Sequence, residues 1–230
     1  MSEPETRRGR THDAEGAREA ILNAAEAVFA EHGFDGARID AIAKASGYNS
    51  SLLFHYFDDK LGLYTEVVKR ADREMSELQA RVLAPLLGAE TDFSNAHDFK
   101  ALLVVIVTTI FDYLIERPRF IRMMLWEQAE GWQTYAKIIA RFSKEDVDQF
   151  EAIFHKARAA GLLRSDFAPL IQMSMVLQIC LSYLTFIPLY QMILFPGEDL
   201  SSSEALAHAR EYLVTFIVNG MMIDLPETNL

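Results

Sequence analysis

The sequence predicts an all-α protein in which a three-helix head precedes a larger helical domain. Apolar residues recur three or four positions apart through most of the 230 residues, and no stretch alternates as a strand would. Half of the residues are apolar, so a sizeable core can form without disulfides or metal ions. Glycines and prolines fall between the periodic segments, at the places where helices end.

The first part of the chain combines two short helices with longer ones. Ile21, Ala25 and Phe29 are spaced to share one face of the first helix, and Gly33 follows at the position of a C-cap. Asp58 and Asp59 are placed to cap the long helix that starts near Lys60. The predicted helices of this part cover residues 17–32, 39–46, 50–57 and 60–83.

The remainder of the chain also shows helical periodicity. Pro118 is suited to a first helical turn, whereas Pro188 lies inside a helix and should kink it. Ser201 and Glu204 have the spacing of a capping box. The predicted helices of this part cover residues 98–116, 118–130, 132–160, 167–195 and 201–219.

Charge and cysteine content limit the possible binding partners and cellular compartments of the protein. The formal net charge is −11, and residues 1–60 hold seven basic against eleven acidic side chains. A general basic surface for nucleic acid is therefore absent, so any DNA contact must come from a local constellation of residues. Cys180 is the single cysteine, which excludes a disulfide framework, and the first residues lack the apolar core of a signal peptide. We expect a cytoplasmic protein.

One segment resembles a membrane span. Residues 167–197 carry no charge, and this run is longer than the roughly 20 apolar residues that a bilayer needs. Polar residues such as Gln172, Gln178 and Ser182 are spread along it, and a lone spanning helix would leave them with few partners. We therefore predict a helix buried in protein, with no membrane partner.

The two short helices suggest a function. A longer helix followed by two short ones around a glycine-containing turn is the pattern of a helix-turn-helix DNA-binding head. Apolar residues at helical spacing, including Ile42, Leu53 and Phe57, would fix the angle between the short helices. The outer face of residues 50–57 could then enter a major groove.

Particular residues strengthen this interpretation. The segment Phe54-His55-Tyr56-Phe57 followed by Lys60 resembles the signature of the TetR family of bacterial transcriptional regulators. Further agreeing positions are Ile21, Leu22, Ala24, Ala25, Phe29, Gly33, Phe34, Ile42, Ala43, Gly47 and Leu53. The resemblance is close over residues 17–64. Beyond residue 64 it extends only to the all-α architecture.

The resemblance implies a dimeric, ligand-controlled regulator, a repressor that leaves a palindromic operator when a small effector binds. It implies homodimerisation through the last two helices, double-stranded DNA as partner, and neither a cofactor nor a catalytic or metal site. The implied organisation is an N-terminal arm at 1–16, a DNA-binding domain at 17–63 and a ligand-binding and dimerisation domain at 64–230. Arg7, Arg8 and Arg10 lie in the arm, which we expect to be flexible.

The DNA-binding candidates depart from the family pattern at several positions. Arg38 stands where a hydroxyl is usual, Ser50 where lysine is common, and Phe54 where tyrosine is usual. Tyr56 and Lys60 are candidates for phosphate contacts. The full set of candidates is Arg38, Asn49, Ser50, Ser51, Leu52, Phe54, His55, Tyr56 and Lys60.

Aromatic residues and methionines are frequent in the second domain and suit an apolar or aromatic effector. The candidates for its pocket are Phe111, Met124, Trp126, Trp132, Tyr135, Phe150, Phe154, Tyr183 and Phe186. An all-α metal-dependent enzyme is an alternative function, but a di-iron site needs paired Glu-x-x-His motifs. The nearest feature is Glu151 with His155, at another spacing and without a second copy.

Overall fold

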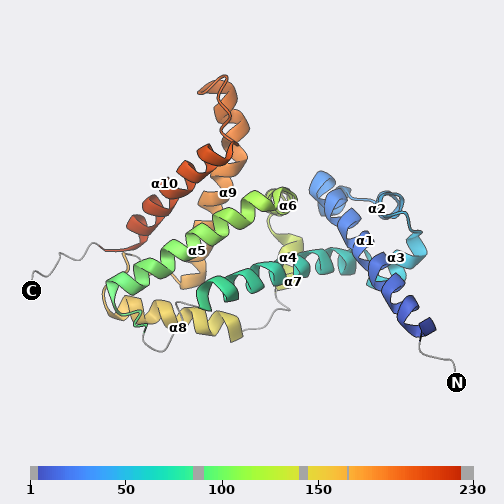
Figure 1. Cartoon of the computed structure of the whole chain (residues 1–230), viewed down its shortest axis with the longest axis horizontal. Coiled ribbons are helices and arrows are strands. Elements are labelled where there is room, and N and C mark those ends of the chain that lie inside the picture. The colour runs from blue at the N-terminus through green and yellow to red at the C-terminus, as the bar shows by residue number, and fades with distance from the viewer. Residues whose placement is uncertain (1–4, 85–90, 140–144, 165, 224–230) are drawn as a thin grey trace, which may run out of the picture. The chain divides into compact units, whose positions relative to one another are not determined.

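The computed structural model describes residues 5–84, 91–139, 145–164 and 166–223 (Figure 1). The described residues form helices and no strand, with one isolated antiparallel bridge between Leu163 and Met222. They divide into two compact units, the first built from residues 1–74 and 117–142 and the second from 75–116 and 143–230. The predicted all-α fold is confirmed.

The first unit contains the two short helices and the helices that support them. It comprises α1 (Glu5–Gly36), α2 (Ile39–Ser46), α3 (Ser50–Phe57), the first part of α4 (Lys60–Leu83), α6 (Pro118–Ala129) and α7 (Gln133–Ile139). Helix α1 packs against both α2 and α6.

Local signals set the boundaries of the short helices. Gly47, at φ 78°, ends α2 in a left-handed conformation that glycine adopts without steric cost. The side chain of Asn49 caps α3 by accepting a hydrogen bond from Leu52 N at 2.9 Å. Asp59 accepts from Gly62 N at 2.6 Å at the start of α4, as predicted. The bounds of α2, α3 and α4 are those that the sequence predicts.

The second unit is built around α5 (Ala96–Glu116), which packs against α9 (Pro169–Ile193) and α10 (Ser203–Met221). Helix α8 (Glu145–Ala159) packs against α9. Phe99 of α5 meets Phe154 of α8 edge to face at 5.3 Å between ring centroids, and both rings are fully buried. The connection between α9 and α10 lies at the tip of a hairpin that extends beyond α5 and α8 (Figure 1).

Some predicted boundaries were wrong. The helix expected over 132–160 is two helices, because α7 ends at Ile139 in the first unit and α8 begins at Glu145 in the second. Helix α1 begins at Glu5, so the backbone of residues 5–16 extends the helix that we expected to start at Ala17. The side chains of Arg7, Arg8 and Arg10 lie outside the described ones.

The cap of the last helix also differs from the prediction. Ser202, rather than Ser201, caps α10 by accepting a hydrogen bond from Ala205 N at 3.3 Å. The hydroxyl of Ser201 donates to Asp199 instead. The capping-box spacing therefore placed the start of α10 slightly too early.

Candidate DNA interface and its support

A buried apolar core fixes the angle of α3. Leu53 and Phe57 lie one helical turn apart, and each is at most 3% exposed. Ile42 of α2 and Phe29 of α1 are fully buried. Because the packed side chains leave little freedom, α3 is a rigid element whose opposite face points to solvent.

That outer face carries a mixture of apolar and polar side chains. Ser51, Phe54 and His55 are exposed, and Leu52 is half-buried. Arg38 is exposed at the N-cap of α2, where its side chain makes no capping hydrogen bond. These five candidates are open to a partner such as DNA.

The other four candidates make hydrogen bonds within the head. Besides the Asn49 cap, Ser50 Oγ donates to Asp40 Oδ1 at 3.0 Å. Tyr56 Oη donates to the carbonyl of Ala14 at 3.2 Å, and Lys60 Nζ donates to the carbonyl of Asp35 at 3.2 Å. The Lys60 ammonium also lies 4.7 Å from the ring centroid of Phe34. The hydroxyls of Ser50 and Tyr56 must exchange these acceptors to donate to phosphate, whereas the Lys60 ammonium has three N–H donors and can keep its bond.

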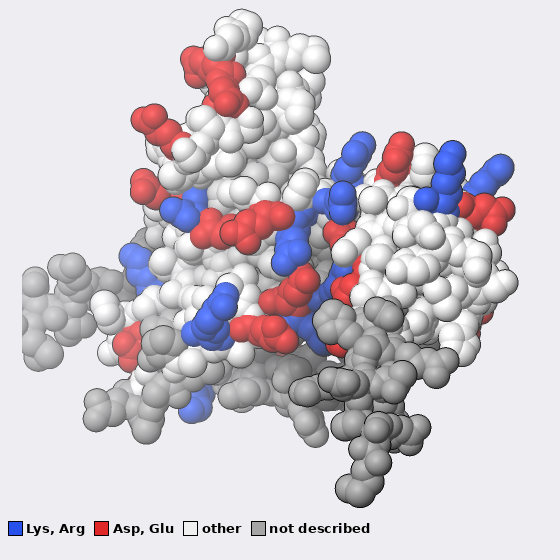
Figure 2. Space-filling view, turned by 45° about the vertical axis from the view of Figure 1, so that its right-hand side comes forward, with Lys and Arg blue, Asp and Glu red and all other residues white. Residues whose placement is uncertain are grey.

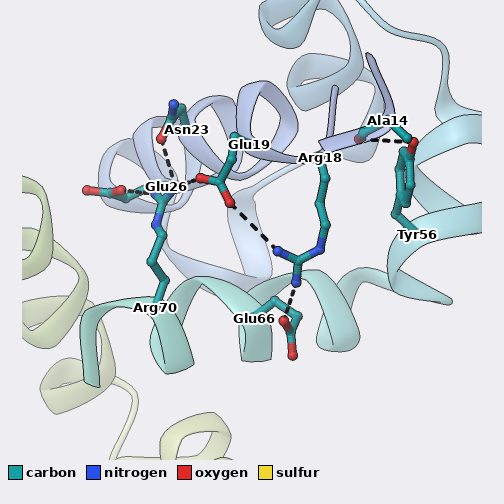
Figure 3. A network of polar contacts seen from close by, with 8 residues as sticks. All are labelled: Ala14, Arg18, Glu19, Asn23, Glu26, Tyr56, Glu66 and Arg70. Atoms are coloured by element: carbon teal, nitrogen blue, oxygen red, sulfur yellow. Dashed lines mark hydrogen bonds and ion pairs between the residues drawn. The ribbon is translucent and has the colours of Figure 1, made fainter. Parts of the chain in front are cut away.

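Ion pairs join α1 to α4 (Figure 3). Arg70 of α4 pairs with Glu19 and Glu26 of α1 and donates to Asn23 Oδ1 at 2.7 Å. The Arg70 side chain is only 13% exposed, so these interactions are less screened than those of an exposed pair. Arg18 of α1 pairs in the reverse direction with Glu66 of α4. The two helices are therefore held in register by charges on both.

A buried carboxylate connects α4 to α6 and α7. Tyr64 Oη donates to Glu127 Oε1 at 2.7 Å, and Tyr135 N donates to Glu127 Oε2 at 3.0 Å. Glu127 is 1% exposed, and Tyr64 lies edge to face with Phe29 at 4.8 Å. Burial and the interaction with Glu127 raise the pKa of Tyr64 well above its usual value. The hydroxyl therefore stays a hydrogen-bond donor.

Two glycines permit close approaches in this unit. Gly33 has φ +68°, and a Cβ there would lie 3.0 Å from the ring of Trp126 on α6. At Gly62 a Cβ would lie 2.0 Å from the carbonyl oxygen of Phe57. Larger residues at either position would displace the helices that support α3.

Comparison with known proteins decides the family. Residues 21–67 match the family described as bacterial regulatory proteins, tetR family. Residues 100–217, about half of the chain, match a tetracyclin repressor-like C-terminal domain. The chain belongs to the TetR family. The resemblance seen in the sequence is confirmed, and the chain is a DNA-binding transcriptional regulator.

Relatives and solved structures agree with this. The HTH-type transcriptional repressor NicS of Pseudomonas putida is 24% identical over 214 residues, which are 92% of this chain and 95% of that protein. The transcriptional regulator RutR of Escherichia coli K12 is 30% identical over 114 residues, 50% of this chain and 49% of that protein. The crystal structure of the regulator SCO4942 from Streptomyces coelicolor has a TM-score of 0.59 at 24% identity, covering 89% of this chain and 98% of that one.

A further structural neighbour contains a bound ligand. The transcriptional regulator FadR from Bacillus subtilis, in complex with stearoyl-CoA, has a TM-score of 0.58 at 16% identity and covers 88% of this chain and 98% of that one. At this identity the likeness shows the fold alone. TetR-family regulators bind DNA and small-molecule effectors and are dimeric.

The effector candidates of this TetR-family chain are divided between the two compact units. Met124, Trp126, Trp132 and Tyr135 belong to the first unit, whereas Phe111, Phe154, Tyr183 and Phe186 belong to the second. The side chain of Phe150 lies outside the described ones. Phe154 and Phe111 are fully buried core residues, and Trp126 packs against Gly33 in the support of the head.

The second unit contains a hollow of about 350 Å³ along α9. It is lined by Gln178, Ile179, Ser182, Tyr183, Tyr190 and Leu213. Tyr183 is the one predicted pocket residue among them, and its ring lies 6.2 Å from that of Phe111. Tyr190, which follows Tyr183 by two helical turns, was not among the predicted pocket residues. The polar residues that argued against a membrane span, Gln178 and Ser182, also belong to this lining.

Helices α9 and α10 present an apolar face to solvent. Its exposed members are Leu170, Ile171, Met175, Phe186, Leu189, Met192, Ile193, Tyr212 and Phe216. Among the described helices, α9 alone is long and apolar enough to cross a membrane by length and composition, and 28% of its most apolar window is buried. In Figure 2 the projecting hairpin is mostly white, with acidic side chains near its tip. One side of α9 is thus buried in the second unit, and the other is open.

Metal-binding residues do not cluster in the part of the chain that the structure describes, where no three of His, Cys, Asp and Glu are placed to hold an ion. His155, half of the pair considered for a metal enzyme, is exposed on α8.

Proposed function

We propose that this chain is a cytoplasmic, homodimeric repressor that binds a palindromic operator through two copies of α3. The observation that carries the proposal is the outer face of α3, held by a fully buried core and by ion pairs from α1 to α4. A rigid helix with an exposed face meets the geometric requirement for reading a major groove. Arg38, Asn49–Leu52, Phe54–Tyr56 and Lys60 are the proposed DNA-binding residues.

The proposed dimer interface is the exposed apolar face of α9 and α10. A monomer would leave these large side chains in water, whereas a two-fold copy of the same face would cover them. Met192 and Ile193 are 77% and 64% exposed, so burying their side chains in a dimer would release a large hydrophobic free energy. If the face instead enters a bilayer, the protein will require detergent for extraction, which separates the two interpretations.

We further propose that an apolar or aromatic effector releases the operator. The hollow beside Tyr183 and Tyr190 is the proposed effector site, because it combines aromatic rings with the polar groups of Gln178 and Ser182. Helix α4 is one continuous helix whose first part belongs to the first unit and whose last turns belong to the second. Movement of α4 would therefore carry an effector's influence toward residues 17–63, the proposed DNA-binding domain.

The deciding experiment is selection of binding sites from random DNA duplexes. The proposal expects an inverted repeat whose half-sites lie about one helical turn apart, roughly 34–36 Å. Binding should weaken with added salt, with a shallow slope because the outer face of the head offers few cations. Selection that enriches no inverted repeat would contradict the proposed function.

A second experiment addresses the effector. Thermal-shift screening of apolar aromatic compounds identifies a ligand, and operator affinity is then measured with and without it. A coupling of about 1–3 kcal/mol predicts a 5–150-fold loss of operator affinity. Ser182→Trp, which fills the hollow, should remove ligand binding; because Ser182 lies one turn from Phe186 on the exposed side of α9, the variant is first shown to be dimeric and its operator binding is then compared. A ligand that binds the wild type without changing operator affinity would contradict control through this site.

A further inference from the structure

The outer face of α3 offers DNA fewer free polar groups than its sequence suggests. Ser50 donates its hydroxyl to Asp40, and the Asn49 side chain caps the helix. On the central part of the helix, the side chains left exposed are Ser51, Phe54 and His55. An aromatic hydrocarbon therefore makes up a large part of what this face presents to a base pair.

Phe54 is exposed although it lies next to the buried side of α3. It is 46% exposed, whereas Leu53, which precedes it, and Phe57, one turn further along, are at most 3% exposed. A helix advances about 100° per residue, so Phe54 lies on the flank between the buried side and the outward-facing Ser51 and His55. Its contact with water is unfavourable, and an apolar group of a partner would relieve it.

The major groove offers one apolar group of this kind. The C5-methyl of thymine projects into the groove, and side chains such as phenylalanine contact it, whereas the other base edges present hydrogen-bond donors and acceptors. Phe54 lacks the hydroxyl that would compete for those edges or for phosphate. An exposed ring without a polar group is therefore suited to contact a thymine methyl.

We propose that Phe54 is a specificity-determining residue that reads a thymine methyl in each half-site. The inference rests on the proposed operator binding and deepens it, because it names the chemical group on the DNA that this side chain recognises. Ser51 and His55 supply hydrogen bonds on the same face, so they determine other positions of the half-site.

The test removes single methyl groups from the DNA. Each thymine of the selected operator is replaced by uracil at both symmetry-related positions, and binding of the full-length protein is measured. Burial of one methyl is worth about a fourfold change in affinity, so the pair of replacements should weaken binding about 15-fold at one thymine position. Replacing that thymine by 5-methylcytosine, paired with guanine, should retain part of the affinity that cytosine loses.

Matched variants assign the effect to Phe54. In Phe54→Ala the uracil penalty should disappear, whereas Phe54→Leu, which keeps an apolar side chain, should retain part of it. Ser51→Ala and His55→Ala should keep the full penalty. All three positions are exposed, and circular dichroism checks that each of the four variants is folded.

Three outcomes would overturn the inference. The first is an operator on which no uracil replacement weakens binding, and the second is a penalty that persists in Phe54→Ala. The third is a penalty that disappears in Leu52→Ala and not in Phe54→Ala. Each of these requires an enriched operator, so each leaves the proposed function standing. Failure of the proposed function is recognised earlier, when selection enriches no site.

Discussion

Helices α4 and α9 are of similar length but differ in what covers their outward side chains. The head-side part of α4 is joined to α1 by Arg18, Glu66 and Arg70, and to α6 by Tyr64. Helix α9 buries residues such as Val176, Cys180 and Ile187 on one side and leaves large apolar residues exposed on the other. The first helix finds its partners within the chain, whereas the second has an apolar face that the described chain does not cover.

The difference shows where each region obtains its stability. Directed hydrogen bonds and ion pairs fix the position of α4. Their contribution to the free energy of unfolding changes little when residues on a distant surface are replaced. The exposed face of α9 contributes favourable hydrophobic free energy only when it is removed from water. This requires a partner surface of the same extent. Changes in the two regions should therefore have separable effects on monomer stability and on assembly.

The largest effect should follow from a charge in the apolar face of α9. Met175 is 50% exposed, and Met175→Glu would place a carboxylate twice in a symmetric interface. We expect dimer affinity to fall by more than about 100-fold, or roughly 3 kcal/mol, as measured by analytical ultracentrifugation. Gln133→Glu, which adds a charge at the exposed start of α7, is the control and should remain dimeric. A wild-type protein that is monomeric at micromolar concentration would remove the basis of the comparison.

The next largest effect should come from the buried carboxylate of Glu127. Glu127→Ala leaves the Tyr64 hydroxyl and the Tyr135 amide without their acceptor and opens a small cavity, so unfolding should become easier by about 2–4 kcal/mol. Chemical denaturation measures this change. Tyr64→Phe removes one donor and should cost less, about 1–2 kcal/mol. Glu130→Ala, on the same turn but half-buried, is the control; an equal loss there would show that the buried hydrogen bonds are not the cause.

A substitution at Gly33 tests how closely α1 can approach the Trp126 ring of α6. Gly33→Ala combines a left-handed backbone with a Cβ 3.0 Å from the indole ring, so we expect a loss of about 1–3 kcal/mol. Gly47→Ala has no steric contact, since no atom lies within 4 Å of its would-be Cβ, and its φ of +78° with ψ 10° is less strained for alanine than the φ of +68° with ψ −179° at Gly33, so its loss should be smaller. Trp126→Ala combined with Gly33→Ala should recover part of the Gly33 loss. Additive losses in the double variant would contradict a steric cause.

The smallest effect should come from the ion pairs of α4. Arg70→Ala removes the contacts with Glu19, Asn23 and Glu26 and should lower the unfolding free energy by about 1 kcal/mol, less at high salt. Arg73, which is exposed on the same helix, provides the control variant Arg73→Ala. Thermal unfolding at low and high salt distinguishes the two. A loss that does not depend on salt would indicate packing of the Arg70 stem rather than charge.

The helices of the head could be predicted from local signals in the sequence. Gly47, Asn49 and Asp59 set helix ends through backbone conformation and capping, which depend on a few neighbouring residues. The exact bounds of α2, α3 and α4 could therefore be predicted, and the motif from Phe54 to Lys60 indicated the family. The uncharged run of residues 167–197 likewise predicted a helix, because length and apolar composition are local properties.

Contacts between residues far apart in the sequence could not be predicted and are known only from the tertiary structure. No glycine or proline lies between residues 132 and 160, yet α7 and α8 fall in different compact units. The approach of Trp126 to Gly33 and the hydrogen bond from Tyr135 N to Glu127 join residues that are far apart or on different helices. The hydrogen bonds of Ser50, Tyr56 and Lys60 were also unpredictable, because each acceptor lies ten or more residues away. Burial and hydrogen bonding join residues according to their positions in space, which the helical period of one segment does not encode.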